Sequence, residues 1–146
     1  MAILFISSSM TYKQQTSVPF LEKYLSAEPF KNILSGVSFN YATEKISIAE
    51  VGYFKFVEFF LRKGAHFFFY FLMGTFLYLG LKKRLKSILL TVVTAFLATV
   101  GYAALDEFHQ MITGGRTPLF QDVMLDGIGG IVGILCVGIY FERKIK

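Results

Sequence analysis

Three long apolar runs, separated by short charged segments, dominate the chain. They cover residues 54–81, 87–105 and 123–141. A transmembrane helix needs about 20 mainly apolar residues to cross a hydrocarbon core of about 30 Å. Backbone groups inside lipid must be satisfied within the segment, which favours helices for single runs of this kind. The pattern therefore predicts an all-α fold: a polytopic membrane helical bundle with three full spans, forming one domain over residues 1–146.

The residues before the first full run have a different pattern. Residues 1–8 begin apolar, but they are too short to cross a bilayer and lack the basic start and cleavage site of a signal peptide. They indicate either a frayed N-terminus or a partial N-terminal span. Residues 9–53 have balanced charges and many apolar positions. We expect this segment to form an outer loop or helical cap, with Val18–Leu25 as a short amphipathic helix along the membrane interface.

The formal net charge of +5 would suit a nucleic-acid-binding protein, but its distribution along the chain argues against one. The surplus lies in two short blocks beside the ends of apolar runs: Lys82, Lys83, Arg84 and Lys86, and then Arg143, Lys144 and Lys146. Cytoplasmic loops of membrane proteins carry such an excess. We therefore expect a cytoplasmic C-terminus, an external segment 106–122 and no nucleic-acid partner. The single cysteine, Cys136, excludes an intramolecular disulfide framework.

Ionisable and amide side chains gather at the predicted outer ends of the spans, where charge next to lipid is expensive and usually functional. The set is Lys63, His66, Asp106, Glu107, His109, Gln110, Arg116, Asp122 and Asp126. Three helix ends supply these residues on one side of the membrane. We expect them to approach one another in a single outer-face cavity, with Arg116 opposite Asp122 or Asp126.

Each candidate also has a structural interpretation. Lys63 could simply extend to the interface, His66 could be a packing residue, and Glu107 could be a solvated helix end. Asp126 is harder to explain in this way, because a carboxylate one turn inside a span needs a partner or a proton. The arginine fork of Arg116 suits a carboxylate or a phosphate.

The chemistry of the residues separates two kinds of candidate. His66, Glu107 and His109 are the candidates for general acid–base catalysis, and the other six residues are candidates for ligand binding: Lys63, Asp106, Gln110, Arg116, Asp122 and Asp126. The two histidines with nearby acids could bind a metal, but no HExxH motif or tight ligand spacing supports that, and no GxSxG elbow is present. The sequence therefore indicates no metal and no cofactor.

Taken in order, these motifs resemble the VanZ-like family of bacterial membrane proteins, whose founding member is associated with low-level teicoplanin resistance. The motifs are Lys63-xx-His66-xxx-Tyr70, Asp106-Glu107-x-His109-Gln110, Gly115-Arg116, Asp122-Val123 and Gly129/Gly130-xx-Gly133, and the resemblance covers about Ile3–Gly138. It implies a multi-pass protein of the bacterial cell membrane. Ile3–Ser9 is similar to the end of the family's first helix, so we expect about a dozen preceding residues to be missing.

Two positions depart from the family pattern. The family usually has Pro before the Gly-Arg pair, where this chain has Gly114, and it often has Asn at the position of Asp126. The first difference should loosen the outer loop, and the second adds a charge.

The leading hypothesis is an integral membrane protein that binds an anionic envelope lipid or peptidoglycan precursor at the outer leaflet and affects glycopeptide susceptibility. The alternative is a membrane-embedded hydrolase or transferase with His66 or His109 as general base and a carboxylate that orients it. A proton-coupled transporter is disfavoured because the charges cluster at one face. A purely architectural polar cluster and the oligomeric state are left open.

Overall fold

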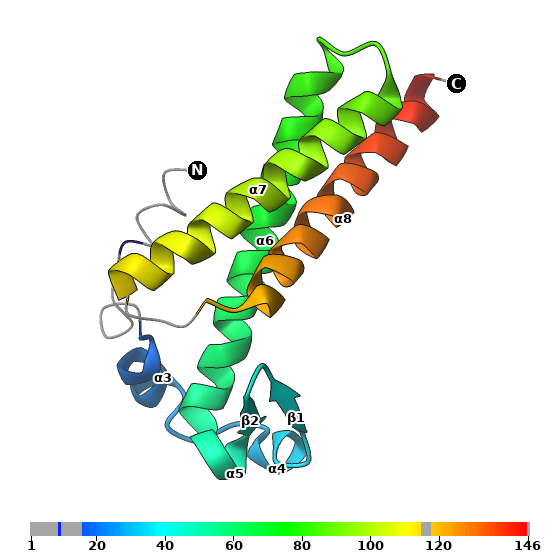
Figure 1. Ribbon diagram of the computed structural model, residues 1–146. Helices are drawn as coiled ribbons and strands as arrows, with labels where there is room; N and C mark the ends of the chain where they lie inside the picture. The colour runs from blue at the N-terminus through cyan, green and yellow to red at the C-terminus, as the bar shows by residue number, and fades with distance from the viewer. Residues whose placement is uncertain (1–8, 10–15, 115–117, 146) are drawn as a thin grey trace.

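The computed structural model describes residue 9, residues 16–114 and residues 118–145. Among them, three helices are long and apolar enough to cross a membrane: α6 (Tyr53–Lys82), α7 (Ile88–Gly114) and α8 (Phe120–Ile145). They pack as a bundle in which α7 runs antiparallel to α6 and α8 (Figure 1). The expected helical membrane bundle with three full spans is confirmed. The expected partial N-terminal span, residues 1–8, lies outside the described residues.

Glycines bring α8 against α6. A Cβ atom built at Gly129 would lie 2.5 Å from the carbonyl oxygen of Phe67, and one at Gly133 would lie 2.1 Å from that of Phe71. No side chain larger than hydrogen fits at these distances, so the two backbones are in direct contact. These two glycines, which belong to the Gly129/Gly130-xx-Gly133 motif, therefore form a glycine strip, a helix-packing surface of the kind that membrane proteins use.

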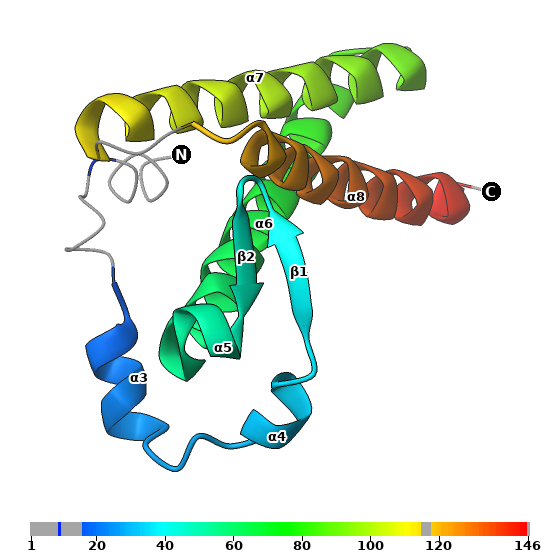
Figure 2. The same cartoon turned by 60° about the horizontal axis from the view of Figure 1, so that its bottom comes forward.

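The two ends of the bundle differ in composition. The turn between α6 and α7 and the C-terminal end of α8 lie together at one end (Figure 1). The first basic block, together with Arg143 and Lys144 of the second, belongs to these segments, so we call this the basic end. The opposite end, which we call the cap end, carries residues 16–52, the end of α7 and the start of α8 (Figures 1 and 2).

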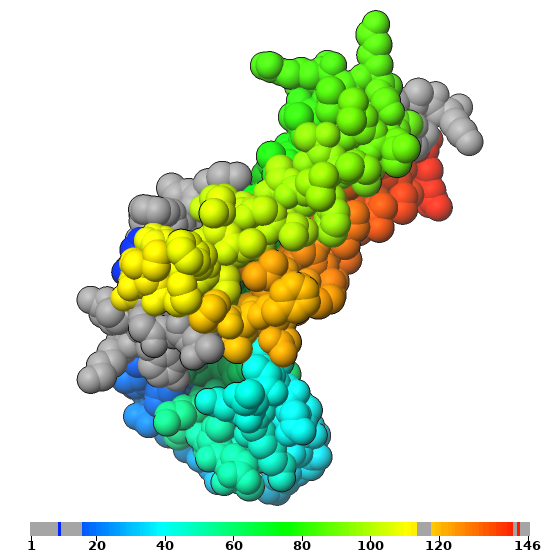
Figure 3. Space-filling model, in the orientation of Figure 1, coloured from blue at the N-terminus to red at the C-terminus, as the bar shows by residue number. Residues whose placement is uncertain are grey.

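Residues 16–52 form a cap around the first turns of α6. The cap consists of α3 (Val18–Tyr24), α4 (Lys31–Leu34), β1 (Ser38–Tyr41), β2 (Glu44–Ser47) and α5 (Ile48–Val51). Figure 3 shows the hairpin and its neighbours as one lobe beyond the start of α8. The segment was expected to be a loop or helical cap, and the antiparallel hairpin β1–β2 was not predicted. Tyr41 of β1 packs edge-on against Phe59 of α6, with 5.1 Å between the ring centroids.

Two helix lengths determine where polar groups lie relative to lipid. The helix α6 has 30 residues, about 45 Å at 1.5 Å per residue, whereas the hydrocarbon core is about 30 Å thick. About ten residues of α6, from Tyr53 to Arg62, therefore exceed the core if the basic end lies at its other edge. The helix α7 likewise continues beyond the expected limit at Leu105 to Gly114. Both surpluses are at the cap end.

Candidate functional site

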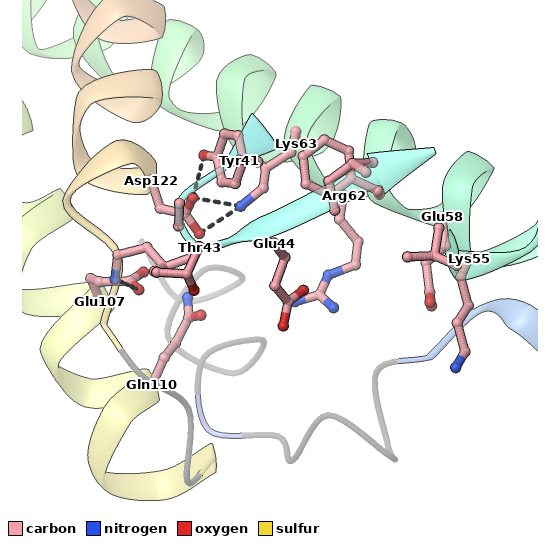
Figure 4. A pocket seen from close by; sticks show the side chains of 15 residues that line it. Tyr41, Thr43, Glu44, Lys55, Glu58, Arg62, Lys63, Glu107, Gln110 and Asp122 are labelled. Carbon is pink, nitrogen blue, oxygen red and sulfur yellow. Dashed lines mark hydrogen bonds and ion pairs between the residues drawn. The ribbon is translucent and has the colours of Figure 1, made fainter. Parts of the chain in front are cut away.

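A cavity of about 590 Å³ opens at the cap end, between the hairpin, the surplus turns of α6, the end of α7 and the start of α8 (Figure 4). Four residues of the predicted set line it: Lys63, Glu107, Gln110 and Asp122. These come from all three long helices, so the structure brings the three helix ends together around one space.

Asp122 is the centre of the hydrogen bonding in this cavity. Lys63 Nζ lies 2.6 Å from both carboxylate oxygens of Asp122. The Tyr41 hydroxyl donates a hydrogen bond to Oδ1 of the same carboxylate. The Lys63 ammonium also lies 4.7 Å from the centre of the Tyr41 ring. Asp122 is in the first turn of α8, where the helix dipole favours a negative charge.

The Tyr41 hydroxyl is held in its protonated form. Burial, and then the hydrogen bond and charge of Asp122, raise the pKa of Tyr41 above its ordinary value of 10.0. A protonated phenol donates to the carboxylate, whereas a phenolate would repel it. Lys63 and Tyr41 therefore act as a pair of donors that fix the orientation of Asp122.

A second pair lies one turn deeper along the same two helices. His66 Nδ1 is 3.4 Å from Oδ2 of Asp126. The His66 ring is stacked on Tyr70, with 6.5 Å between centroids and 14° between planes. Asp126 is 4% exposed, and neither its Oδ1 atom nor the Tyr70 hydroxyl has a hydrogen-bond partner among the described residues. A histidine beside a buried carboxylate is the arrangement of a general base and the group that orients it.

The polar residues of α7 extend the network to the third helix. Gln110 Nε2 donates to Asp106 Oδ2 at 3.1 Å, which is the contact expected from their i, i+4 spacing. Both residues are buried, and Gln110 also lines the cavity. Glu107 accepts a hydrogen bond of 2.8 Å from the backbone N–H of Leu119. Glu107 is thus a link between the end of α7 and the start of α8 rather than a solvated helix end.

Of the predicted set, His66, Asp106, His109 and Asp126 are described but do not line this cavity. His109 is half-buried on α7, outside the lining of the cavity. Arg116 lies outside the described residues, so its expected position opposite Asp122 or Asp126 stays a prediction. Lys63, for which extension to the interface was the simple interpretation, is the residue that pairs with Asp122.

Sequence reasoning missed six charged or polar residues of the cavity: Tyr41, Thr43, Glu44, Lys55, Glu58 and Arg62. Figure 4 shows that Arg62 and Glu44 extend into the cavity from α6 and from the hairpin. Lys55, Glu58 and Arg62 follow one another at spacings of three and four, which places them on one helix face. That spacing could have identified these three. Tyr41 and Glu44 depend on the hairpin, which was not predicted.

No metal site emerges from the described ranges: they contain no group of three or more His, Cys, Asp or Glu side chains arranged to hold a metal ion. The chemistry available in this region is that of cations, carboxylates, an amide, a phenol and an imidazole. Such a set can bind charged and hydroxyl-bearing groups and can exchange protons.

Comparison with known proteins adds one match. The sequence model of the VanZ/LLP1 family matches residues 1–141. No curated protein and no solved structure matches the chain.

Proposed function

Because the chain belongs to the VanZ/LLP1 family and is a multi-pass membrane protein, we propose that its cavity binds the phosphate-bearing head of an anionic envelope lipid or lipid-linked peptidoglycan precursor. In this proposal the cap end faces the outer leaflet, and binding there affects glycopeptide susceptibility. The observation that carries the proposal is the place of the cavity on the surplus turns of α6 at the cap end.

The cavity wall on α6 runs from Lys55 to Lys63. These residues fall in the part of α6 that exceeds the hydrocarbon thickness, or at its edge. Lipid head groups occupy this level, so a lipid could place its head in the cavity while its chains stay in the bilayer. Apolar side chains of Phe59 and Leu119 also line the cavity, which suits a ligand that is polar at one end only.

Three cations and four carboxylates belong to the lining of the cavity, which suits a head that joins a phosphate to hydroxyl or amine groups. Arg62 presents a guanidinium with five N–H donors, and this geometry matches phosphate oxygens. Lys55 adds a second cation to the lining, and Lys63 is paired with Asp122. Glu44 and Gln110 supply acceptors for hydroxyl or amine groups of the head.

Binding of phosphatidylglycerol and of undecaprenyl phosphate to the full-length protein in mixed micelles, measured by native mass spectrometry, tests the proposal. A lost charge-assisted hydrogen bond costs about 1.5–3 kcal/mol, so Arg62→Gln should weaken binding about 10- to 100-fold. Arg62→Lys keeps the charge but loses the fork, and should lie between the parent and Arg62→Gln. Arg84→Gln, at the exposed basic end, is the matched control and should bind like the parent. Equal binding by all variants would refute a phosphate site in this cavity.

The cellular part of the proposal needs a separate measurement. Teicoplanin susceptibility should be compared in cells that express the parent, Arg62→Gln or Arg84→Gln at equal folded yield. Cells that express the parent or Arg84→Gln should differ in susceptibility from cells without the protein. This difference should be smaller in cells that express Arg62→Gln. If the parent has no effect on susceptibility while lipid binding holds, the binding proposal stands and the link to glycopeptides fails.

The pair formed by His66 and Asp126 favours a second candidate, a membrane-embedded hydrolase or transferase. His66 lies one turn below Lys63, so a proton taken up by its ring could come from a water or hydroxyl beside a bound head group. In this alternative Asp126 orients the imidazole. Release of the head group from the same two lipids should then occur with the parent and be lost in His66→Gln, while lipid binding is kept. No turnover by the parent would exclude the enzyme for these substrates.

A further inference from the structure

We infer that the aromatic face of α3 is a membrane-docking surface that lies in the lipid head-group layer beside the cap end of α6. The surface is formed by Phe20 and Tyr24. These side chains are 61% and 63% exposed, although they lie outside the segments that can span the membrane. This inference does not depend on the proposed ligand.

The helix α3 has two distinct faces. Leu21 is 4% exposed and is the one buried residue of the helix. Phe20 and Tyr24 are i, i+4 and their rings are in contact, with 4.5 Å between the ring centroids and 39° between the planes. Glu22 lies about 200° around the helix from Phe20 at 100° per residue. The apolar surface of α3 is therefore one continuous stripe, and the acidic residue is on the other side.

A hydrogen bond fixes the depth of α3 relative to the spans. The backbone N–H of Ser17, immediately before α3, donates to Oε1 of Glu58 at 2.5 Å. Glu58 precedes Lys63 by about 7–8 Å along α6, and the polar layer on each side of a bilayer is about 5–8 Å thick. With the edge of the hydrocarbon core near Lys63, the start of α3 lies at the level of the lipid head groups.

The chemistry of the stripe fits lipid as its occupant. Aromatic side chains are enriched at this depth, where their rings meet the upper acyl chains and a phenol meets water. Lys23 places its ammonium 5.5 Å from the centre of the Tyr24 ring, so a cation is available next to the aromatic surface for lipid phosphates. Phe60 and Leu61 of α6 are also exposed, and they lie close to the same level.

The chain contains no tryptophan, so single-tryptophan variants report on one position each. Phe20→Trp and Tyr24→Trp, with Glu22→Trp as the control on the opposite side, should be made in the full chain and reconstituted into phosphatidylcholine–phosphatidylglycerol vesicles. Quenching is measured with water-soluble acrylamide and with lipids brominated on the upper acyl chain. Far-UV circular dichroism checks that each variant keeps its helix content.

We expect brominated lipid to quench the two aromatic-face tryptophans, and acrylamide to quench them roughly threefold less than the tryptophan at position 22. Equal acrylamide quenching at all three positions would show that α3 lies in water and would overturn the inference. Protection of the aromatic face from both quenchers would also overturn it, because protein rather than lipid would then cover the surface.

Discussion

The ion pair between Lys63 and Asp122 gives the sharpest test of how the site is held together. Replacement of Lys63 by Met removes the ammonium but keeps a long apolar side chain. Asp122 then loses the partner that lies 2.6 Å from both of its oxygens and keeps only the Tyr41 hydroxyl. The carboxylate remains in a place where water replaces the lost partner only in part.

The magnitude follows from the exposure of the pair. Both side chains are 22% exposed. Removal of one partner from a fully buried pair costs about 3–5 kcal/mol, whereas exposed pairs contribute about 0–1 kcal/mol. We therefore expect Lys63→Met to lower the free energy of unfolding by about 2 kcal/mol, which is about 30-fold in the unfolding equilibrium. The double variant Lys63→Met/Asp122→Asn removes both charges and should recover at least half of that loss.

Unfolding by sodium dodecyl sulfate in mixed micelles, followed by far-UV circular dichroism, measures these differences. Lys83→Met, an exposed lysine at the basic end, should change stability by less than about 0.5 kcal/mol. A Lys63→Met variant as stable as Lys83→Met would contradict the reasoning. So would a double variant whose loss equals the sum of its two single losses, because the two side chains would then not interact.

Three further predictions concern protonation, packing and orientation. Tyr41→Phe should destabilise the protein by about 1.5–3 kcal/mol below pH 10, because a hydrogen bond to a carboxylate is lost. The pKa of Tyr41 is raised on folding, so the parent loses this advantage as the pH rises above 10.0. The unfolding curves of the parent and of Tyr41→Phe should then converge. Gly133→Ala should destabilise the protein by more than about 2 kcal/mol, because the new Cβ atom would overlap the backbone of α6. A Cβ atom at Gly101 has nothing within 4 Å, so Gly101→Ala should be neutral or stabilising. The same unfolding assay compares the two variants, and equal effects would contradict the packing. In a cysteine-free background, Lys83→Cys should react with impermeant maleimide only from the cytoplasm and Thr113→Cys only from outside, and reversed labelling would overturn the proposed orientation.

Sequence periodicity was sufficient for the spans and insufficient for the cap. The runs 54–81 and 123–141 lie within α6 and α8, because about 20 apolar residues leave few alternatives in lipid. The hairpin could not be predicted because its turn lacks the usual chemistry. Ala42 occupies the left-handed region with φ of 54°, a position where Gly, Asn or Asp is the usual indication of a turn.

The helix of the third span continues beyond the apolar run 87–105 to Gly114. Asp106 and Glu107 follow the apolar run, but charge does not end a helix. Asp106 and Gln110 bond each other along one face, and the helix continues until Gly114. Because of this extension, Glu107 reaches the backbone of Leu119. A correct end for α7 would have required knowledge of these partners, and a single sequence does not contain it.

The sequence treats the polar residues and the glycine strip as separate features, but the structure joins them. The helices α6 and α8 run parallel (Figure 1), and their polar pairs are separated by nearly constant sequence distances, 59 residues for Lys63–Asp122 and 60 for His66–Asp126. The backbone contact of Gly129 with Phe67 continues the same register toward the basic end. Glycine contacts within the membrane bring the two backbones close, and this closeness lets a lysine and a histidine reach carboxylates across the interface one turn apart. The glycines of α8 are therefore a structural requirement of the site, although none of those in the strip lines the cavity.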